Sequence, residues 1–299
     1  MPPKVTIVAN CQGAPLAGIL KLFFGIQVVE VIAVHRQDVI KVDVLERAVE
    51  ASDFVLTQEI HRGYPVEWVR TAALRERWPS KLMVWQNLYF RGYNPELIYL
   101  RPERGRHYRG PLGDYHIADI VEGFRGGRPA AVVAREIRDP DFNRARYGAE
   151  IEASVAELRD REKATITPVA DYIEKNFQHR RLFYTFNHPS NALIFRAAAM
   201  IAGAIGLRRL QPFRADLINE ALNEILLPIN PAVRLDVSET VSDWNHFTGF
   251  DYSFRPERVV AVGRNRRFYT PEEVVEHFYR VYDFLKLDGV GDRPHIMPL

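Results

Sequence analysis

The stretch that decides the fold is VTIVANCQG, residues 5–13. Its first five residues form a short apolar run rich in β-branched side chains, which is typical of a strand buried on both faces. After the run ends at Asn10-Cys11-Gln12-Gly13, apolar residues recur with the spacing of one helical face at Leu16, Ile19, Leu20 and Phe23. We therefore expect a strand that turns directly into a helix, and we expect the helix to end at Gly25.

The same alternation continues through the first hundred residues. Apolar, β-rich runs at 28–34, 53–57 and 81–85 predict three more strands, and helical spacing at 44–51 and 66–78 predicts two more helices. A β-α-β-α-β-α-β series of this kind is typical of a parallel sheet with helices on both faces. The sequence thus predicts a three-layer α/β fold.

The remaining two thirds of the chain are less regular. Residues 91–113 are rich in Gly, Pro and Arg, so we expect a long connection, of the length that often covers or lines a site. Further expected elements are helices at 117–124, 147–162 and 169–177, a fifth strand at 182–186 and an apolar helix at 192–207 with Ser190 or Asn191 as N-cap. After Pro212 the pattern is mainly helical, with a capping box at Thr270-Pro271-Glu272-Glu273. We expect residues 1–210 to form the α/β core that carries the site, and residues 211–299 to form a mainly helical lobe packed on it.

Composition excludes several classes of protein. The 299 residues hold 40 Lys and Arg against 38 Asp and Glu, a net charge of +2 that argues against a nucleic-acid partner. A single cysteine excludes an internal disulfide and the zinc sites built from cysteine pairs, which favours the reducing cytoplasm. The N-terminal apolar stretch is too short for a secretory signal, and the longest apolar run, 197–207, is too short for a membrane span. The sequence leaves open whether the protein is a monomer or a homo-oligomer.

Polar side chains follow the ends of the predicted strands. In open parallel sheets ligands bind where the carboxyl ends of the strands meet the following loops and helices. This rule selects Asn10-Cys11-Gln12-Gly13 after the first strand, Gln58 and His61 after the third, Asn87 and Phe90 after the fourth, and Asn187-His188 after the fifth. We expect these sets, distant in sequence, to lie close together.

Cys11 has two interpretations. At a strand-to-helix turn, the helix dipole and unpaired backbone N–H groups would stabilise a thiolate, so a reactive nucleophile is one interpretation. The other is a small buried side chain that packs against the sheet. Neighbouring Asn10 and Gln12, whose amides could orient a substrate or donate to an oxyanion, favour a functional role.

His188 also has two interpretations. Between a predicted strand and an apolar helix, a neutral imidazole could act as a general base, or it could be a structural histidine held by neighbouring amides. The other candidate histidines are His35, His61, His107, His116 and His246. None of the histidines shows metal-ligand spacing, so we predict no structural metal.

No nucleotide-binding fingerprint is present. The sequence lacks both G-x-G-x-x-G and G-x-x-x-x-G-K-S/T, which disfavours NAD and ATP chemistry. Basic residues cluster at Arg101, Arg104, Arg106, His107 and Arg109, at His179-Arg180-Arg181, and at Arg264, Arg266 and Arg267. We interpret them as solvated faces, with the alternative that one cluster holds phosphates. We interpret the aromatic residues Trp85, Tyr89, Phe90 and Tyr93 mainly as core or loop anchors. The alternative is that they form a platform on which an adenine ring stacks.

Three motifs together resemble those of a known family. They are Ala9-Asn10-Cys11-Gln12-Gly13, Asn87-Leu88-Tyr89-Phe90-Arg91-Gly92-Tyr93-Asn94-Pro95-Glu96 and Thr185-Phe186-Asn187-His188-Pro189-Ser190-Asn191. In order and spacing they are similar to the signatures of the WcbI family of polysaccharide biosynthesis proteins, over about residues 5–207. The resemblance implies binding of coenzyme A (CoA) or acetyl-CoA and O-acetylation of a capsular or other surface polysaccharide precursor.

The layout is also similar to that of SGNH-type hydrolases, which have a Rossmann-like sheet, a nucleophile after the first strand and a late base histidine. Here Cys11 stands where those enzymes have serine. Their Asp-x-x-His element is missing, because Thr185-Phe186-Asn187 precedes His188. A hydrolase-style triad is therefore in doubt.

These observations predict an acyltransferase that moves an acetyl group from acetyl-CoA to a sugar hydroxyl. Either Cys11 accepts the acyl group and His188 assists, or His188 deprotonates the sugar while Asn10, Gln12 and Asn87 stabilise the oxyanion. The alternatives are an esterase using Cys11 and His188, and a non-catalytic CoA-binding or glycan-binding accessory protein. The expected catalytic residues are Cys11, His188, Asn10 and Gln12, and the expected cofactor-binding residues are Gly13, Gln58, His61, Asn87, Phe90, Tyr93, Asn187 and Asn191.

Overall fold

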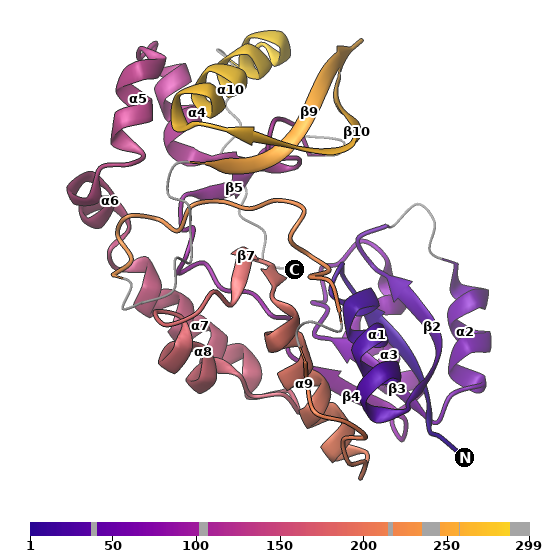
Figure 1. Cartoon of the computed structure of the whole chain (residues 1–299). Coiled ribbons are helices and arrows are strands. Elements are labelled where there is room, and N and C mark those ends of the chain that lie inside the picture. Colours follow the sequence, from indigo (N-terminus) through magenta and orange to yellow (C-terminus); the bar gives the residue numbers. More distant parts are fainter. Residues whose placement is uncertain (37–40, 102–106, 215–217, 235–245, 257, 288–299) are drawn as a thin grey trace.

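The computed structural model describes residues 1–36, 41–101, 107–214, 218–234, 246–256 and 258–287, with the backbone alone for 261–265. Figure 1 shows a sheet with its helices at one end of the molecule and a long β-hairpin with further helices at the other.

The sheet at the first end is parallel and has four strands. They are β1 (Lys4–Ala9), β2 (Gln27–Ala33), β3 (Phe54–Gln58) and β4 (Leu82–Trp85), in the order β2-β1-β3-β4. Each lies within one residue of the range predicted for it. Because β1 is central, with parallel partners on both sides, its carboxyl end opens between the ends of β2 and β3.

Helices cover both faces of the sheet, as the α/β pattern predicts. Ile7 on β1 packs into one core with α1 (Gly13–Phe24) and α9 (Asn191–Ala204). Its neighbour Val8 points to the opposite face, into a core with α2 (Val42–Glu50) and α3 (Thr71–Arg77). A short 3-10 turn, η2 (Glu67–Val69), precedes α3. The α1 helix ends at Gly25 with φ of 67°, the left-handed conformation that favours glycine.

The predicted fifth strand does not join this sheet. Phe183–Thr185 forms β7, which pairs antiparallel with the two-residue β8 (His188–Pro189) instead. The apolar α9 then begins at Asn191, with Ser190 as its N-cap. The composition of residues 182–186 predicts a strand, but it carries no signal for the partner with which that strand pairs.

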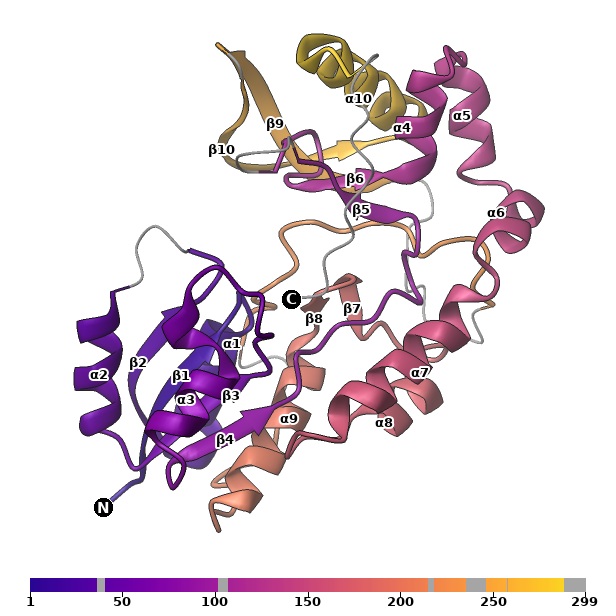
Figure 2. The same cartoon turned by 180° about the vertical axis from the view of Figure 1, so that it is seen from behind.

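The second end of the molecule contains strands that the sequence pattern did not predict. Inside the predicted connection lies β5 (Leu97–Tyr99), which pairs with β6 (Tyr115–Ile117) just after it. In the C-terminal region, β9 (Phe247–Arg255) pairs with β10 (Arg258–Tyr269) in a long hairpin. The C-terminal α10 (Pro271–Leu285) begins with the predicted capping box at Thr270. Together with α4 (Ala118–Arg125) and α5 (Ala130–Glu136), these elements enclose a separate core (Figure 2).

Three further helices, α6 (Pro140–Tyr147), α7 (Glu150–Glu162) and α8 (Ala170–Asn176), connect the two ends. The C-terminal segment packs on residues 97–134 in the second core. No helix in the described part of the chain has the length and apolar character needed to span a bilayer.

Candidate functional site

The turn after β1 begins the candidate site. Asn10 Oδ1 accepts a hydrogen bond from the backbone N–H of Gln12 at 2.9 Å, which fixes the turn that contains Cys11. Gly13 starts α1 close to the sheet: a Cβ there would lie 3.0 Å from the Cβ of Ala9 and 3.1 Å from Cγ1 of Val31. Gly13, expected to contact a cofactor, thus also has a packing reason to be glycine.

Gln12 is the centre of an amide network at the carboxyl edge of the sheet. Its Oε1 accepts hydrogen bonds from Gln58 Nε2 at 2.9 Å and from the Leu88 N–H at 3.1 Å. Its Nε2 donates to the carbonyl oxygens of Leu88 at 2.8 Å and Asn187 at 2.9 Å. Because both amide hydrogens are used, Gln12 has none left for the expected oxyanion role. Its role in the structure is to tie the segments together.

Asn10, Gln58 and Asn87 complete this network. The Asn10 backbone N–H donates to Gln58 Oε1 at 2.9 Å, and Asn10 Nδ2 donates to Asn87 Oδ1 at 3.2 Å. Gln58, only 3% exposed, is therefore part of the scaffold. The Nδ2 group of Asn87 hydrogen-bonds to none of the described residues and is not among their fully buried unpaired atoms. Asn87 therefore keeps an amide donor for a ligand.

A second network, centred on Tyr115, surrounds the Asn187-His188 turn. The Tyr115 hydroxyl donates to Asn187 Oδ1 at 2.6 Å and lies 3.3 Å from His188 Nε2. Thr185 donates to Tyr115 at 3.1 Å, and Asn187 Nδ2 donates to the Tyr99 hydroxyl at 3.1 Å. Since Tyr115 gives its one hydrogen to Asn187, its oxygen is left to accept the Nε2–H of His188. This arrangement favours the tautomer whose lone pair is on Nδ1.

His188 is a neutral imidazole in this setting. Burial is the main cause that lowers its pKa to about 4; the nearby His35 acts in the same direction, and a hydrogen bond to the Leu222 backbone opposes both. Nδ1 is buried and makes no hydrogen bond of normal geometry with the described residues. A buried nitrogen lone pair without a partner is costly unless a ligand uses it. His188 is therefore unprotonated at neutral pH, as a general base must be, but burial makes it a weak base in the ligand-free protein.

Cys11 does not have the thiolate character expected at a helix N-terminus. Burial raises its pKa to about 11, and the opposing effect of its own backbone N–H is smaller. A Cys11 thiolate would in turn raise the pKa of Tyr99 and of Tyr115, which places the thiol near both rings. Tyr115 thus connects the surroundings of Cys11 to His188. The resting site holds a neutral thiol and a neutral imidazole.

Several residues expected to bind a cofactor lie elsewhere. Phe90 is fully buried among Tyr93, Phe177 and Phe183, and Tyr93 is 1% exposed with its hydroxyl bonded to the Phe177 and Arg180 carbonyls. Both are core anchors because their rings fill the space beneath α8 and β7.

His61 and Asn191 have local partners. His61 is exposed and accepts a hydrogen bond from the Gly63 N–H at 3.1 Å. At the start of α9, Asn191 donates to the Asn219 carbonyl and to Glu220, each at 2.8 Å. Neither residue joins the amide network or the Tyr115 network. Both hold loops in place.

Sequence reasoning missed the three residues around His188 that matter most for its orientation, namely Tyr99, Tyr115 and Thr185. Tyr99 also stacks on His107, with ring centroids 4.6 Å apart and planes 4° apart. Tyr115 is in a three-residue strand that pairs with β5, which is too short to show a periodic pattern. Only the spacing of Tyr99 and Tyr115 on paired strands could have suggested a connection between them.

Comparisons with known proteins agree with this arrangement of motifs. A solved structure described as WcbI, a polysaccharide biosynthesis enzyme, superposes with a TM-score of 0.70 and 21% identity over 96% of this chain and 91% of that chain. It is a native form without a disulfide bond between CoA and a cysteine of that protein. No curated protein sequence matches the chain significantly.

The family model for the polysaccharide biosynthesis enzyme WcbI matches residues 4–210, which include all three motifs. This match covers more than half of the chain, and the structural likeness independently supports the same fold. The chain belongs to the WcbI family of polysaccharide biosynthesis enzymes.

Proposed function

We propose that the protein transfers an acetyl group from acetyl-CoA to a hydroxyl of a sugar in a capsular or other surface polysaccharide precursor. The observation that carries the proposal is the hydrogen bond between Gln12 and Asn187, which joins the neighbours of Cys11 and His188. Family membership supports a role in polysaccharide biosynthesis. CoA is supported by the solved relative, whose description pairs it with a cysteine.

In the proposed reaction His188 acts as the general base. Nδ1 takes the proton of the sugar hydroxyl while the sugar oxygen attacks the thioester carbonyl carbon. When the tetrahedral intermediate collapses, the carbon–sulfur bond breaks, and the imidazolium returns the proton to the departing CoA sulfur. The products are the acetyl ester of the sugar and CoA. Tyr115 positions the ring by accepting the Nε2–H.

The oxyanion of the intermediate needs donors that the scaffold does not already use. Asn87 Nδ2 is such a donor among the described residues, since its carbonyl oxygen alone is held by Asn10 and Gln58. Gln12 is excluded from this role because its two hydrogens bind carbonyl oxygens. We therefore assign charge stabilisation to Asn87 in place of Gln12.

Direct transfer fits the site better than an acetyl-Cys11 intermediate. With a pKa of about 11, about one thiol in ten thousand is ionised at pH 7, so Cys11 is a weak nucleophile in the resting protein. Cys11 is the chain's one cysteine, and in our proposal it lies beside the CoA sulfur, where an oxidant would join the two in a disulfide.

Rapid-quench labelling separates the two routes. Enzyme mixed with radiolabelled acetyl-CoA and an acceptor sugar is denatured at times within one turnover. Direct transfer predicts labelled sugar with no label on Cys11, and a Cys11→Ser variant that keeps most of its transfer rate. Stoichiometric label on Cys11 before product would establish the covalent route instead.

The alternatives predict different results in the same assay. An esterase would release acetate from an acetylated sugar without CoA, although among described residues His188 has no carboxylate partner of the kind a hydrolase triad uses. An accessory protein would bind CoA tightly and show no transfer that depends on His188. Loss of transfer in His188→Gln with CoA binding retained would exclude the accessory role.

A further inference from the structure

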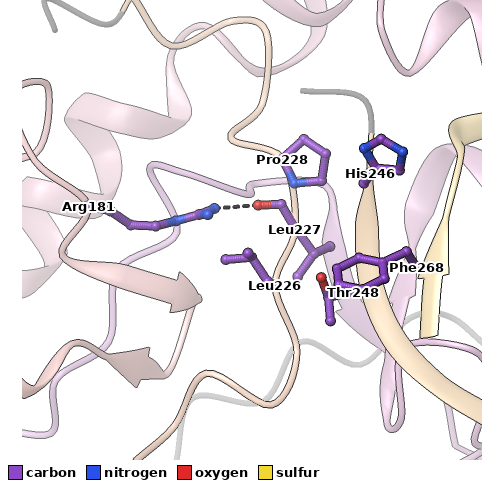
Figure 3. Close-up of a pocket in the computed structure, with 7 residues that line it drawn as sticks. All are labelled: Arg181, Leu226, Leu227, Pro228, His246, Thr248 and Phe268. Atoms are coloured by element: carbon purple, nitrogen blue, oxygen red, sulfur yellow. Dashed lines mark hydrogen bonds between the residues drawn. The ribbon is translucent and has the colours of Figure 1, made fainter. Parts of the chain in front are cut away.

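A cavity of about 340 Å³ lies between the segment that leads into β7 and the β9–β10 hairpin (Figure 3). The residues that line it include Arg181, Leu226, Pro228, His246, Thr248 and Phe268. Arg181 enters from one side, whereas Thr248 and Phe268 come from the hairpin on the other side, with His246 just before β9. None of these residues belongs to the two networks around Gln12 and Tyr115.

Arg181 is a half-buried cation without a countercharge among the described residues. The sequence pattern placed it in a solvated cluster, but its guanidinium reaches the Leu227 carbonyl through Nη2 and the Phe183 carbonyl at 3.2 Å through Nε. Burial lowers its pKa to about 10. Two carbonyl oxygens satisfy hydrogen bonds without neutralising the charge, so the remaining guanidinium N–H groups favour an anion.

The opposite wall is suited to an anion attached to a flat or apolar group. Phe268 is 65% exposed, which is unusual for a phenylalanine and leaves its ring accessible at the mouth of the cavity. Thr248, 3% exposed, supplies a hydroxyl, and the exposed His246 lies on the same wall. Leu226 and Pro228 provide the apolar lining.

We propose that this cavity binds a phosphate ester of a nucleotide, with Arg181 pairing with the phosphate oxygens and Phe268 packing against the base. The choice of nucleotide rests on the proposed function. Acetyl-CoA carries an adenosine 3′,5′-bisphosphate, and an activated sugar acceptor carries a nucleoside diphosphate. Both sources share the same chemistry of phosphate oxygens next to a flat ring. The sequence pattern indicates basic clusters as alternative phosphate sites. Of their residues, Arg104 and Arg106 lie outside the described part of the chain, as does the side chain of Arg264.

Titration calorimetry with the full chain tests the proposal. The probes are adenosine 3′,5′-bisphosphate for the donor and uridine diphosphate for the acceptor. At least one should bind the wild type, and Arg181→Met should weaken that binding roughly tenfold or more, because a charge-assisted pair is lost. The matched control is Arg180→Met, which removes the exposed neighbouring arginine and should leave affinity within about twofold.

Arg181 also donates a hydrogen bond to the Leu227 carbonyl, so its replacement could disturb the fold. A second variant therefore tests the same cavity. Phe268→Ala removes an exposed ring and should fold normally, yet weaken the same probe about three- to tenfold. Its control is Phe254→Ala on the same hairpin, 43% exposed and outside the cavity. Failure of both probes to bind the wild type, or affinity within twofold of wild type in both Arg181→Met and Phe268→Ala, would overturn the proposal.

These measurements distinguish a failure of the cavity proposal from a failure of the proposed function. Acetyl transfer with nucleotide affinity unchanged in Arg181→Met and Phe268→Ala would refute the cavity assignment and leave the transferase intact. Nucleotide binding that depends on Arg181, with no acetyl transfer to any sugar, would support the cavity and refute the transferase. The probe that binds identifies the source of the phosphate.

Discussion

Gln12 Nε2 lies 2.9 Å from the carbonyl oxygen of Asn187, a contact between residues 175 positions apart. It fixes the turn that carries Cys11 against the turn that carries His188. Since Gln12 is fully buried and all of its hydrogen bonds are used, this contact depends on the identity of the side chain. The assembly of the site is therefore linked to one amide.

Gln12→Glu should destabilise the protein and abolish activity. The substitution places a carboxylate oxygen against the Leu88 and Asn187 carbonyls, so two hydrogen bonds become repulsive contacts, at a cost of roughly 3 kcal/mol or more. Urea unfolding measures the change. The matched control is Gln211→Glu, where an exposed amide donates to the Leu22 carbonyl, and the expected change is within about 0.5 kcal/mol. Equal stability of the two variants would contradict this role for Gln12.

Tyr115→Phe should lower the transfer rate more than the stability. The ring remains, but His188 Nε2 loses its acceptor and Asn187 loses a donor, so the imidazole is free to adopt the other tautomer. We expect kcat to fall about 10- to 100-fold. Nitrogen NMR should show His188 protonated on Nε2 in the wild type and a mixture in the variant. Tyr279→Phe, which removes a hydroxyl bonded to the Arg128 carbonyl, is the control and should change neither reading.

The parallel sheet was predictable from the sequence because its strands are β-rich runs and each of the first three is followed by a helical pattern. Local signals also set the helix ends, such as the left-handed Gly25 and the Thr270 capping box. The long hairpin was not predictable in the same way. Gly249 interrupts the pattern of β9, and the reason is tertiary: a Cβ there would lie 2.1 Å from the Pro111 carbonyl oxygen.

The candidate site was predictable only in part. The rule for strand ends selected Asn10, Gln12, Gln58 and Asn87, and the structure joins them in one hydrogen-bond network. The rule could not distinguish scaffold from reactive group, because that depends on how many hydrogen bonds each amide already makes. It also could not predict the ionisation of Cys11, since burial opposes the helix N-terminus and its extent is a property of the folded chain.

Alkylation of the single thiol should report this ionisation. With a pKa of about 11, the rate of Cys11 modification by iodoacetamide should keep rising with pH through 9, whereas a thiolate stabilised by the helix would react at a rate independent of pH above neutrality. Mass spectrometry of the native protein gives the rates, and an unstructured cysteine peptide is the reference. A plateau below pH 8 would show that the thiol is activated.

His116 should contribute acid sensitivity to the fold. It is fully buried between Tyr282 and the Tyr108 carbonyl, and burial lowers its pKa from 6.5 to about 4. Between pH 4 and 6.5 the unfolded chain therefore binds more protons than the folded chain. The contribution of His116 to the free energy of unfolding is complete above pH 6.5, and it decreases by about 3 kcal/mol as pH falls toward 4.

Glu96 acts with the opposite sign. Burial raises its pKa from 4.5 to about 7, so its contribution falls as pH rises through that range. The two effects overlap, and the wild-type curve alone does not separate them. The difference in unfolding free energy between wild type and His116→Gln should therefore shrink as pH falls from 7 to 4.5. A difference that is constant over this range would show that His116 titrates normally in the folded protein.

In our proposal Cys11 and His188 face one site for the reactive end of acetyl-CoA, and a crystal structure with bound CoA would show whether they do. We expect the CoA sulfur to contact Cys11 Sγ, with the His188 imidazole on the same side and Asn87 Nδ2 directed toward the thioester position. CoA bound at the opposite edge of the sheet, or with its sulfur away from both residues, would contradict this proposal.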